Sequence, residues 1–236
     1  MKGLLVEALA FLLERVRGRQ LNLDSRADIF LVMRHAFSKG IPPLLRGFLK
    51  RVFFCRVEGL LFIGCGVKIL CPSLLKTGKN LFLGDYCYID CLSVAGVSIG
   101  NNVTIREFGW LQISSGYSNL GDSVIIGNSN YFGPRCIIGA AAPIMIGNDN
   151  QFGANLSLIA ENHVFSKSGL VSEQGVRRAG INIGSGCWFG NNVTVLDGVT
   201  IGDGVVIGAG SVVTKSVPSG AVAYGVPARV AKMRAD

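Results

Sequence analysis

The sequence is poor in the residues from which metal sites and disulfide frameworks are built. Its 236 residues include two histidines, and its seven cysteines form an odd set with no CxxC pair. Structural and catalytic zinc sites need several such ligands at short spacing, so no metal site is expected. The cysteines are instead predicted to be small apolar core residues of a protein in a reducing cytoplasm.

Long apolar runs are missing as well. No uninterrupted stretch approaches the roughly 20 residues that a transmembrane helix requires. The apolar start of the chain contains Glu7 and Glu14 and lacks a small-residue cleavage site, which argues against a signal peptide.

Charge is scarce and unevenly distributed. Charged residues make up 16% of the chain, yet the net charge is +8, and most of this excess lies in residues 1–60. A basic segment of this kind favours contact with an anionic partner, and it carries no recognised nucleic-acid motif. We therefore expect a cytoplasmic protein that binds no nucleic acid and makes a peripheral contact at the inner face of an anionic membrane.

Residues 1–60 have a helical pattern. Leu5, Leu9 and Leu12 belong to an apolar face at three-to-four spacing. Asp24 or Ser25 is expected to cap a second helix, which Gly40 and Pro42-Pro43 are expected to end. The segment 44–54 alternates apolar and basic residues, and the simplest interpretation of residues 1–60 is a helical cap over the open end of the following domain.

Glycine is the residue in excess, with 32 copies, and from about residue 61 it recurs in a repeat of six. The inward positions of the clearest frame are Ile183, Phe189, Val195, Ile201, Ile207 and Val213. An aliphatic residue every six positions, with glycine or asparagine between, is typical of short strands joined by tight turns. The repeat predicts an all-β parallel β-helix over residues 61–236, with three strands in each coil of about 18 residues.

One long interruption breaks the repeat at residues 159–180. A loop longer than about 12–15 residues in a compact fold is usually functional or disordered. This loop begins with Asn162-His163, which contains one of the two histidines. A histidine titrates near neutral pH, so it is suited to take a proton from a hydroxyl group during attack on an activated acyl group.

The chain resembles the hexapeptide-repeat acyltransferases, most closely the galactoside, maltose and polysaccharide O-acetyltransferases. The resemblance covers residues 61–236 and rests on Asn162-His163, Glu173-Gln174-Gly175, Cys187-Trp188-Phe189-Gly190, the run 198–215 and Gly225-Val226-Pro227-Ala228-Arg229. It implies a left-handed β-helix, a homotrimer with active sites between subunits, and acetyl transfer from acetyl-CoA to a carbohydrate acceptor. His163 would be the general base, and Trp188 and Glu173 would be active-site neighbours.

The resemblance also implies a coenzyme A site in the last coils and in the C-terminal tail, residues 217–236. The residues that match the family's CoA-lining positions are Asn191, Ala209, Thr214, Lys215, Arg229 and Lys232. Small residues suit a pantetheine arm, and lysine or arginine suits phosphate groups. The family's acceptor-binding asparagine and aspartate align with Gly133 and Ala141, so the acceptor is not carried over. A cell-envelope glycan or its precursor is expected instead.

One alternative to this function is excluded by the sequence, and three remain open. A γ-type carbonic anhydrase needs three zinc histidines per site and is excluded by the two histidines of the chain. A sugar-nucleotide N-acetyltransferase would use the same base and donor. A Cys187 nucleophile is a mechanistic rival to His163. A non-catalytic β-solenoid that binds a partner would need neither the His163 loop nor a basic tail.

Overall fold

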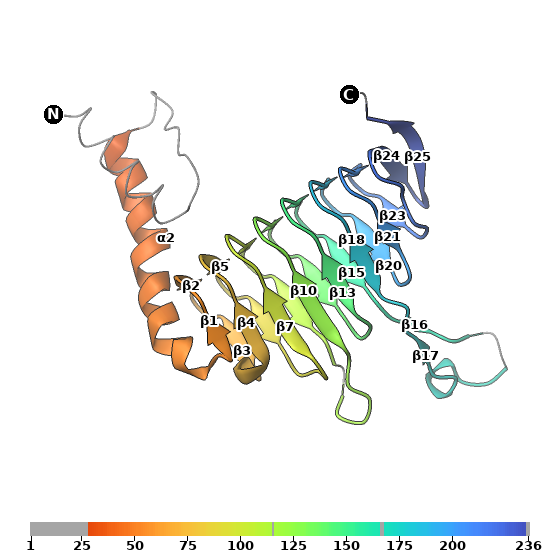
Figure 1. Ribbon diagram of the computed structural model, residues 1–236, viewed down its shortest axis with the longest axis horizontal. Helices are drawn as coiled ribbons and strands as arrows, with labels where there is room; N and C mark the ends of the chain where they lie inside the picture. The colour runs from red at the N-terminus through yellow and green to blue at the C-terminus, as the bar shows by residue number, and fades with distance from the viewer. Residues whose placement is uncertain (1–27, 115, 166–167, 235–236) are drawn as a thin grey trace.

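The computed structural model describes residues 28–114, 116–165 and 168–234, and this part of the chain forms a parallel β-helix preceded by one long helix (Figure 1). The β-helix has three long sheets, which we name A, B and C in the order in which the chain visits them. Each coil contributes one strand to each sheet, as the period of six predicted. The fold class is therefore the one expected from the sequence.

The strands stack in register along each sheet. Sheet A contains β1 (Arg56–Val57), β4 (Leu75–Thr77), β7 (Gly96–Ile99), β10 (Ser123–Ile126), β13 (Ile144–Ile146), β18 (Ile181–Ile183) and β21 (Thr200–Ile201). Sheet B contains β2 (Leu61–Ile63), β5 (Leu81–Leu83), β8 (Thr104–Ile105), β11 (Tyr131–Phe132), β14 (Gln151–Phe152), β19 (Trp188–Phe189), β22 (Val206–Ile207), β24 (Ala221–Gly225) and β25 (Ala228–Met233). Sheet C contains β3 (Lys68–Leu70), β6 (Tyr88–Asp90), β9 (Trp110–Gln112), β12 (Ile137–Gly139), β15 (Ser157–Ile159), β20 (Thr194–Leu196) and β23 (Val212–Val213).

The core is the interior of the coil, and the repeat supplies it. All six inward positions of the clearest frame, from Ile183 to Val213, are at most 3% exposed. Three phenylalanines stack on successive coils, with ring centroids 4.6 Å apart between Phe132 and Phe152 and 4.9 Å apart between Phe152 and Phe189. The four buried cysteines, Cys87, Cys91, Cys136 and Cys187, lie in this core, and all seven cysteines are free thiols.

The corners explain the glycine and asparagine content. At the corner between sheets A and B, the side-chain oxygen of Asn128 accepts a hydrogen bond from the Asn101 amide at 2.8 Å, and that of Asn148 accepts one from Asn128 at 2.7 Å. Adjacent coils approach so closely at such corners that a Cβ on Gly190 would lie 2.6 Å from the Ala209 nitrogen. Only glycine fits there without displacing the next coil.

The N-terminal helix differs from the prediction. α2 spans Ile29–Lys50, its N-cap is Asp28, and it continues through Gly40 and Pro42-Pro43 before the 3-10 turn η1 (Arg51–Phe53). The expected caps and the expected end were therefore wrong. Packing against the first coil outweighs the local cost of the two prolines, because Pro43 and Gly47 are both buried against the β-helix. The expected helix around Leu5 to Val16 lies outside the described residues.

α2 covers the open edge of the first coil, where it packs on β2. Arg46 donates a hydrogen bond to the Ile63 carbonyl at 2.7 Å, and Lys50 donates one to the Val67 carbonyl at 3.1 Å. These carbonyls belong to a coil with no strand before it, so the helix satisfies groups that would otherwise be an exposed sheet edge. Arg46 and Lys50 thus bind the body of the protein, and the outward face of the helix carries apolar side chains such as Phe37 and Phe48.

The other end is closed by the C-terminal tail. β24 continues sheet B in parallel, and β25 folds back on it as an antiparallel edge strand. Within the described part of the chain, no helix combines the length and the apolar character needed to cross a membrane.

Two long loops leave the β-helix at one edge, where sheet C turns into sheet A; we call it the C–A edge. One loop is residues 160–180, where an interruption at 159–180 was expected and Ile159 is instead the last residue of β15. The other is residues 113–122, which was not predicted. They leave after β9 and β15, which are separated in sheet C by β12 alone, and Arg178 of one loop contacts Asn119 and Leu120 of the other. This neighbourhood is the candidate site.

Candidate active site

His163 lies on a short hairpin within the loop 160–180. β16 (Asn162–His163) pairs antiparallel with β17 (Val176–Arg177), so that His163 faces Val176, and the Val164 amide donates to the Gly175 carbonyl at 3.0 Å. The His163 side chain is exposed. A two-residue ladder is too short to be stable by itself, so the hairpin depends on what holds its base.

An ion pair holds that base. Arg178 Nε lies 2.8 Å from Glu161 Oε2, and the two side chains are only 21% and 24% exposed. Arg178 also donates to the Asn119 side chain at 2.9 Å and to the Leu120 carbonyl at 3.3 Å. Glu161 and Arg178 flank the hairpin directly, so this cluster joins both of its strands to the loop 113–122. The sequence analysis did not identify any of these residues.

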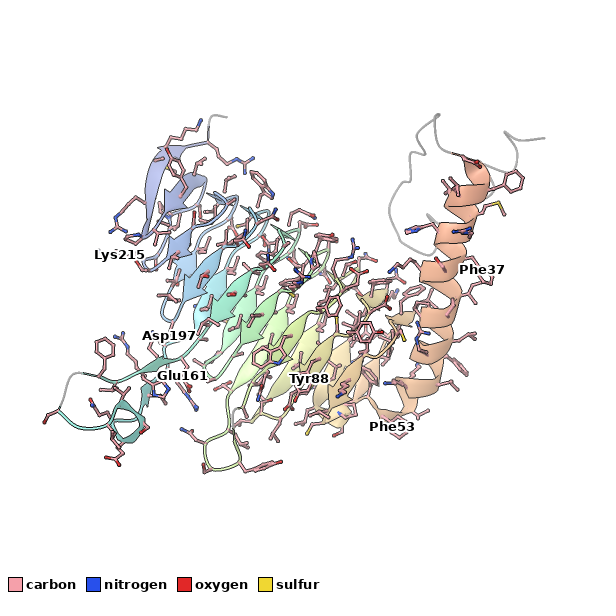
Figure 2. The ribbon with its side chains drawn as sticks, turned by 180° about the vertical axis from the view of Figure 1, so that it is seen from behind. Phe37, Phe53, Tyr88, Glu161, Asp197 and Lys215 are labelled. Carbon is pink, nitrogen blue, oxygen red and sulfur yellow. The ribbon has the colours of Figure 1, made fainter. Side chains whose placement is uncertain are left out.

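Asp197 fixes the point where the loop re-enters the coil. Its carboxylate accepts hydrogen bonds from the amides of Ala179 at 2.9 Å and Gly180 at 2.8 Å. Asp197 belongs to the next turn of the C–A edge, and Figure 2 shows Glu161, Asp197 and Lys215 following one another along this side of the molecule. The loop is therefore anchored at both ends by carboxylates.

Thr214 and Lys215, two of the predicted CoA residues, lie at the C–A edge directly after β23. The hairpin of His163 leaves after β15, which is separated from β23 in sheet C by β20 alone. Two strand spacings correspond to about 10 Å along the β-helix axis. Both side chains are exposed, so a cationic group and a hydroxyl group are presented at the same edge as the histidine.

Asn191 and Ala209 occupy a different edge, where sheet B turns into sheet C. They lie on successive coils beside Gly190, and the Asn191 side-chain oxygen accepts a hydrogen bond from the Ala154 amide at 2.8 Å. Part of the Asn191 side chain thus serves the corner ladder of the β-helix. Ala209 leaves this edge with little side-chain bulk.

Arg229 and Lys232 are on β25, at the end of the β-helix. Tyr224 faces Arg229 across the hairpin, and Val222 faces Lys232. Both basic side chains are exposed, and Arg229 donates one hydrogen bond to its neighbour, the Ala228 carbonyl, at 2.9 Å. The tail therefore adds two cations near the last coils.

Trp188 is on neither of these edges. It belongs to β19, and its side chain is 57% exposed on the outer face of sheet B. In a three-sided prism the face B lies opposite the C–A edge, so one chain does not bring Trp188 and His163 together. Glu173 is exposed in the 3-10 turn η3 (Val171–Glu173) at the far end of the loop.

Cys187 is a poor candidate for a nucleophile. Its side chain is 1% exposed and points into the core, where the thiol donates to the Gly202 carbonyl at 3.2 Å. Burial raises the pKa of the Cys187 thiol, which disfavours the reactive thiolate. Within residues 28–114, 116–165 and 168–234, no group of three or more His, Cys, Asp or Glu side chains is arranged to hold a metal ion.

Comparison with known proteins supports the repeat and the fold. Residues 180–215 match the family model of the bacterial transferase hexapeptide (six repeats). A probable acetyltransferase of Mycobacterium tuberculosis is 31% identical over 170 residues, which are 71% of this chain and 54% of the relative. The galactoside O-acetyltransferase of Escherichia coli is 36% identical over 133 residues, which are 54% of this chain and 62% of the relative. The chain thus spans less than two thirds of the length of these relatives.

Among solved structures, the N-acyltransferase AntD of Bacillus cereus, in complex with dTDP and 3-hydroxybutyryl-CoA, has a TM-score of 0.56 at 20% identity. The match covers 80% of this chain and 88% of AntD. Identity at this level supports the fold alone. Together with the family match, it confirms the left-handed β-helix of hexapeptide repeats that the sequence predicted.

Proposed function

Because this chain carries the hexapeptide repeat of the bacterial transferases, and its curated relatives are named acetyltransferases, we propose that it is an acetyl-CoA-dependent O-acetyltransferase. The acceptor would be a sugar hydroxyl of a cell-envelope glycan or its precursor. The observation that carries the proposal is an exposed histidine on an anchored hairpin, at the same edge as Thr214-Lys215.

The proposed reaction is a direct transfer. His163 accepts the proton of the sugar hydroxyl while the oxygen attacks the thioester carbonyl of acetyl-CoA. The tetrahedral intermediate then collapses, the carbon–sulfur bond breaks, and the imidazolium returns the proton to the sulfur of the leaving CoA. The products are a sugar acetate and CoA thiol. No covalent acyl-enzyme is needed, in agreement with the buried and protonated Cys187.

Coenzyme A would lie along the last coils. Ala209 and the neighbouring glycines leave room for a pantetheine arm, and Lys215, Arg229 and Lys232 supply cations for its phosphate groups. An Arg229→Ala variant is expected to raise the KM for acetyl-CoA about tenfold or more, because bonds to charged groups contribute about 1.5–3 kcal/mol. Lys76→Ala, a change on the outer face of sheet A, is the matched control.

We propose that the active site is shared between subunits of a homotrimer. Trp188 lies on the face opposite the C–A edge, so His163 can approach a tryptophan of this kind only on another copy. The loop also exposes the apolar side chains of Phe165 and Leu170, which a neighbouring subunit would cover. Mixing inactive His163→Ala and Trp188→Ala subunits should restore part of the activity. Activity no greater than that of the separate variants would contradict a shared site.

The function itself is tested by acceptor-dependent release of CoA thiol. Purified protein, acetyl-CoA and a panel of galactosides, amino-sugar nucleotides and lipid-linked oligosaccharides would be combined. An alkali-labile product identifies an ester and supports O-acetylation. An alkali-stable amide would identify a sugar-nucleotide N-acetyltransferase instead; the structurally similar AntD is an N-acyltransferase. Failure to bind CoA at about 1 mM would favour a non-catalytic β-solenoid.

We also propose that the outward face of α2 makes a peripheral membrane contact. Phe30, Phe37, Leu45 and Phe48 are each at least 60% exposed along this face, and residues 1–60 carry most of the net positive charge. Sedimentation with vesicles of anionic and of zwitterionic phospholipid tests the contact. Preference for the anionic vesicles, lost on changing Phe37 and Phe48 to serine, is expected. Equal sedimentation with both lipids would contradict it.

A further inference from the structure

A cavity of about 400 Å³ lies between α2 and the outer face of sheet B, away from the His163 edge. Its floor carries Phe62, Phe82, Thr104 and Tyr131, which lie on the successive strands β2, β5, β8 and β11 of sheet B. His35, Ala36, Lys39 and Gly40 of α2 form one wall. Neither the sequence analysis nor the proposed CoA site uses this cavity.

The charges at the cavity balance one another. Lys39 Nζ lies 3.1 Å from Glu107 Oε1 and 3.6 Å from Asp85 Oδ2, and Arg106 Nε lies 2.8 Å from Glu107 Oε2. Arg106 also donates to the Tyr131 hydroxyl at 3.2 Å. Lys39, Arg106 and Glu107 thus offer donors and acceptors at one end of the cavity. Asp85 does not line the cavity, but it pairs with Lys39, so that the four charges of the network sum to zero.

Glu107 stays ionised at neutral pH. Burial raises the pKa of its carboxyl group, but hydrogen bonds from Arg106, from its own backbone and from Lys39 outweigh burial and lower the pKa to about 2. A phosphate or carboxylate ligand would meet the fixed negative charge of Glu107. A purely apolar ligand would strip water from the three charged side chains that line the cavity. The cavity therefore favours a neutral ligand that is rich in hydroxyl groups.

A sugar ring has this chemistry. Its hydroxyl groups can both donate to the carboxylates and accept from Lys39 and Arg106, and its apolar face can pack on the aromatic floor formed by Phe62 and Phe82, whose ring centroids are 6.5 Å apart. Neutral polyols thus match the floor and the charged end together. No other ligand class considered above matches both.

The cavity is in line with the proposed active site. Tyr131 pairs with Gln151, and Gln151 pairs with Trp188, so the three side chains form one column on the outer face of sheet B. Two strand spacings, about 10 Å, separate Tyr131 from Trp188. An oligosaccharide that reached Trp188 with one residue could place another residue in the cavity.

We infer that this cavity is a subsite for a neutral sugar residue of the acceptor glycan, distinct from the residue whose hydroxyl group is acetylated. The inference rests on the proposed function for the identity of the glycan as an acceptor. The binding of a neutral sugar in the cavity does not depend on it.

Binding of oligosaccharides without acetyl-CoA tests the subsite. Titration calorimetry would compare maltotetraose, chitotetraose, a galacturonic acid tetramer and uridine diphosphate against the full chain. Ala36→Trp fills the cavity from α2, whereas Ser38→Trp introduces the same side chain at an exposed position of the same helix and serves as the matched control. At least one neutral tetramer should bind, and Ala36→Trp should weaken it at least tenfold with an unchanged Tm. Ser38→Trp should bind like the wild type.

Three results would overturn the subsite. The first is that neither neutral tetramer binds at about 10 mM. The second is that Ala36→Trp binds the neutral tetramer as tightly as the wild type does. The third is that the protein prefers uridine diphosphate or the acidic tetramer. The outcomes are separable from those for the activity. If binding depends on Ala36 but no acceptor releases CoA thiol, the subsite stands and the transferase proposal falls. If thiol release occurs and Ala36→Trp leaves the KM for every oligosaccharide acceptor unchanged, the transferase stands and the subsite falls.

Discussion

Replacement of Arg178 by alanine should release the hairpin that carries His163. The guanidinium makes an ion pair with Glu161 and hydrogen bonds to Asn119 and Leu120, all at one point between the two long loops. Hydrogen bonds to charged groups contribute about 1.5–3 kcal/mol each when the partner stays buried. Because these groups are about a quarter exposed and water replaces part of the loss, we expect a total of about 2 kcal/mol.

That free energy concerns the hairpin and not the whole fold. The β-helix core continues on both sides of the loop, so local opening becomes more frequent while global unfolding hardly changes. A loss of about 2 kcal/mol corresponds to roughly 30-fold faster exchange of the Val164 amide, which is bonded to Gly175. We expect kcat to fall by a similar factor, whereas CoA affinity should be unchanged, because the predicted CoA residues lie on other coils.

Hydrogen exchange measured by NMR, together with steady-state kinetics, tests this prediction. Arg177→Ala is the matched control, since Arg177 is the exposed last residue of β17 and directly precedes Arg178. Glu161→Gln should reproduce most of the effect of Arg178→Ala, and the double variant should be less than additive. If Arg177→Ala and Arg178→Ala accelerate exchange equally, the ion pair does not anchor the hairpin and the reasoning is wrong.

Three further predictions concern the fold and the rival mechanism. Gly47→Ala should lower the free energy of unfolding by about 1–3 kcal/mol, because its Cβ would overlap the Leu61 carbonyl. Gly40→Ala, whose Cβ would have no atom within 4 Å, should be neutral or stabilising by up to about 1 kcal/mol. Chemical denaturation checks both variants. Cys187→Ala should keep full activity in the thiol-release assay and lose about 1 kcal/mol of stability. The lowered pKa of Glu107 implies stability that is present above about pH 4.5 and is lost as the pH falls towards about 2, so the Tm advantage of the wild type over Glu107→Gln should shrink in that window; a constant advantage would contradict the ionised state.

The sequence was most informative where contacts are local and periodic. The spacing of six placed Ile183, Phe189 and their successors inside the coil, because each hexad repeats the same strand and turn. The corner glycines and asparagines were predictable for the same reason. In such a fold, the position of a residue in the repeat determines whether its side chain points into the coil, independently of distant parts of the chain.

The helix end that was predicted wrongly and the loop that was not predicted both have causes outside the local sequence. Gly40 and Pro42-Pro43 are helix breakers by local preference, yet α2 passes through them, because Pro43 and Gly47 pack on a coil that only exists once the repeat has folded. The loop 113–122 is about half as long as the loop 160–180 and is rich in serine and glycine. The repeat frame resumes directly after it, so the loop left little signal in the sequence. Tyr117 of this loop is 90% exposed in the structure. In the sequence, this single aromatic residue did not indicate that the segment leaves the β-helix.

The site was predicted in its composition and not in its arrangement. His163 and Lys215 were recognised by resemblance, but Arg178 reaches residue Asn119 across 59 positions of the chain, and no spacing rule connects them. The cavity beside α2 likewise combines residues from 35 to 131. Pairings of this kind depend on how the coils stack, which a single sequence does not encode in any short pattern.

The central claim is that His163 acts as the base in acetyl transfer from CoA. Its most direct test is the rate of acceptor-dependent CoA thiol release by His163→Ala, measured beside the affinity of the same variant for CoA. We expect kcat to fall at least about 100-fold while the Kd for CoA changes less than about twofold. A variant that keeps the wild-type kcat with the best acceptor would contradict the proposed role of His163.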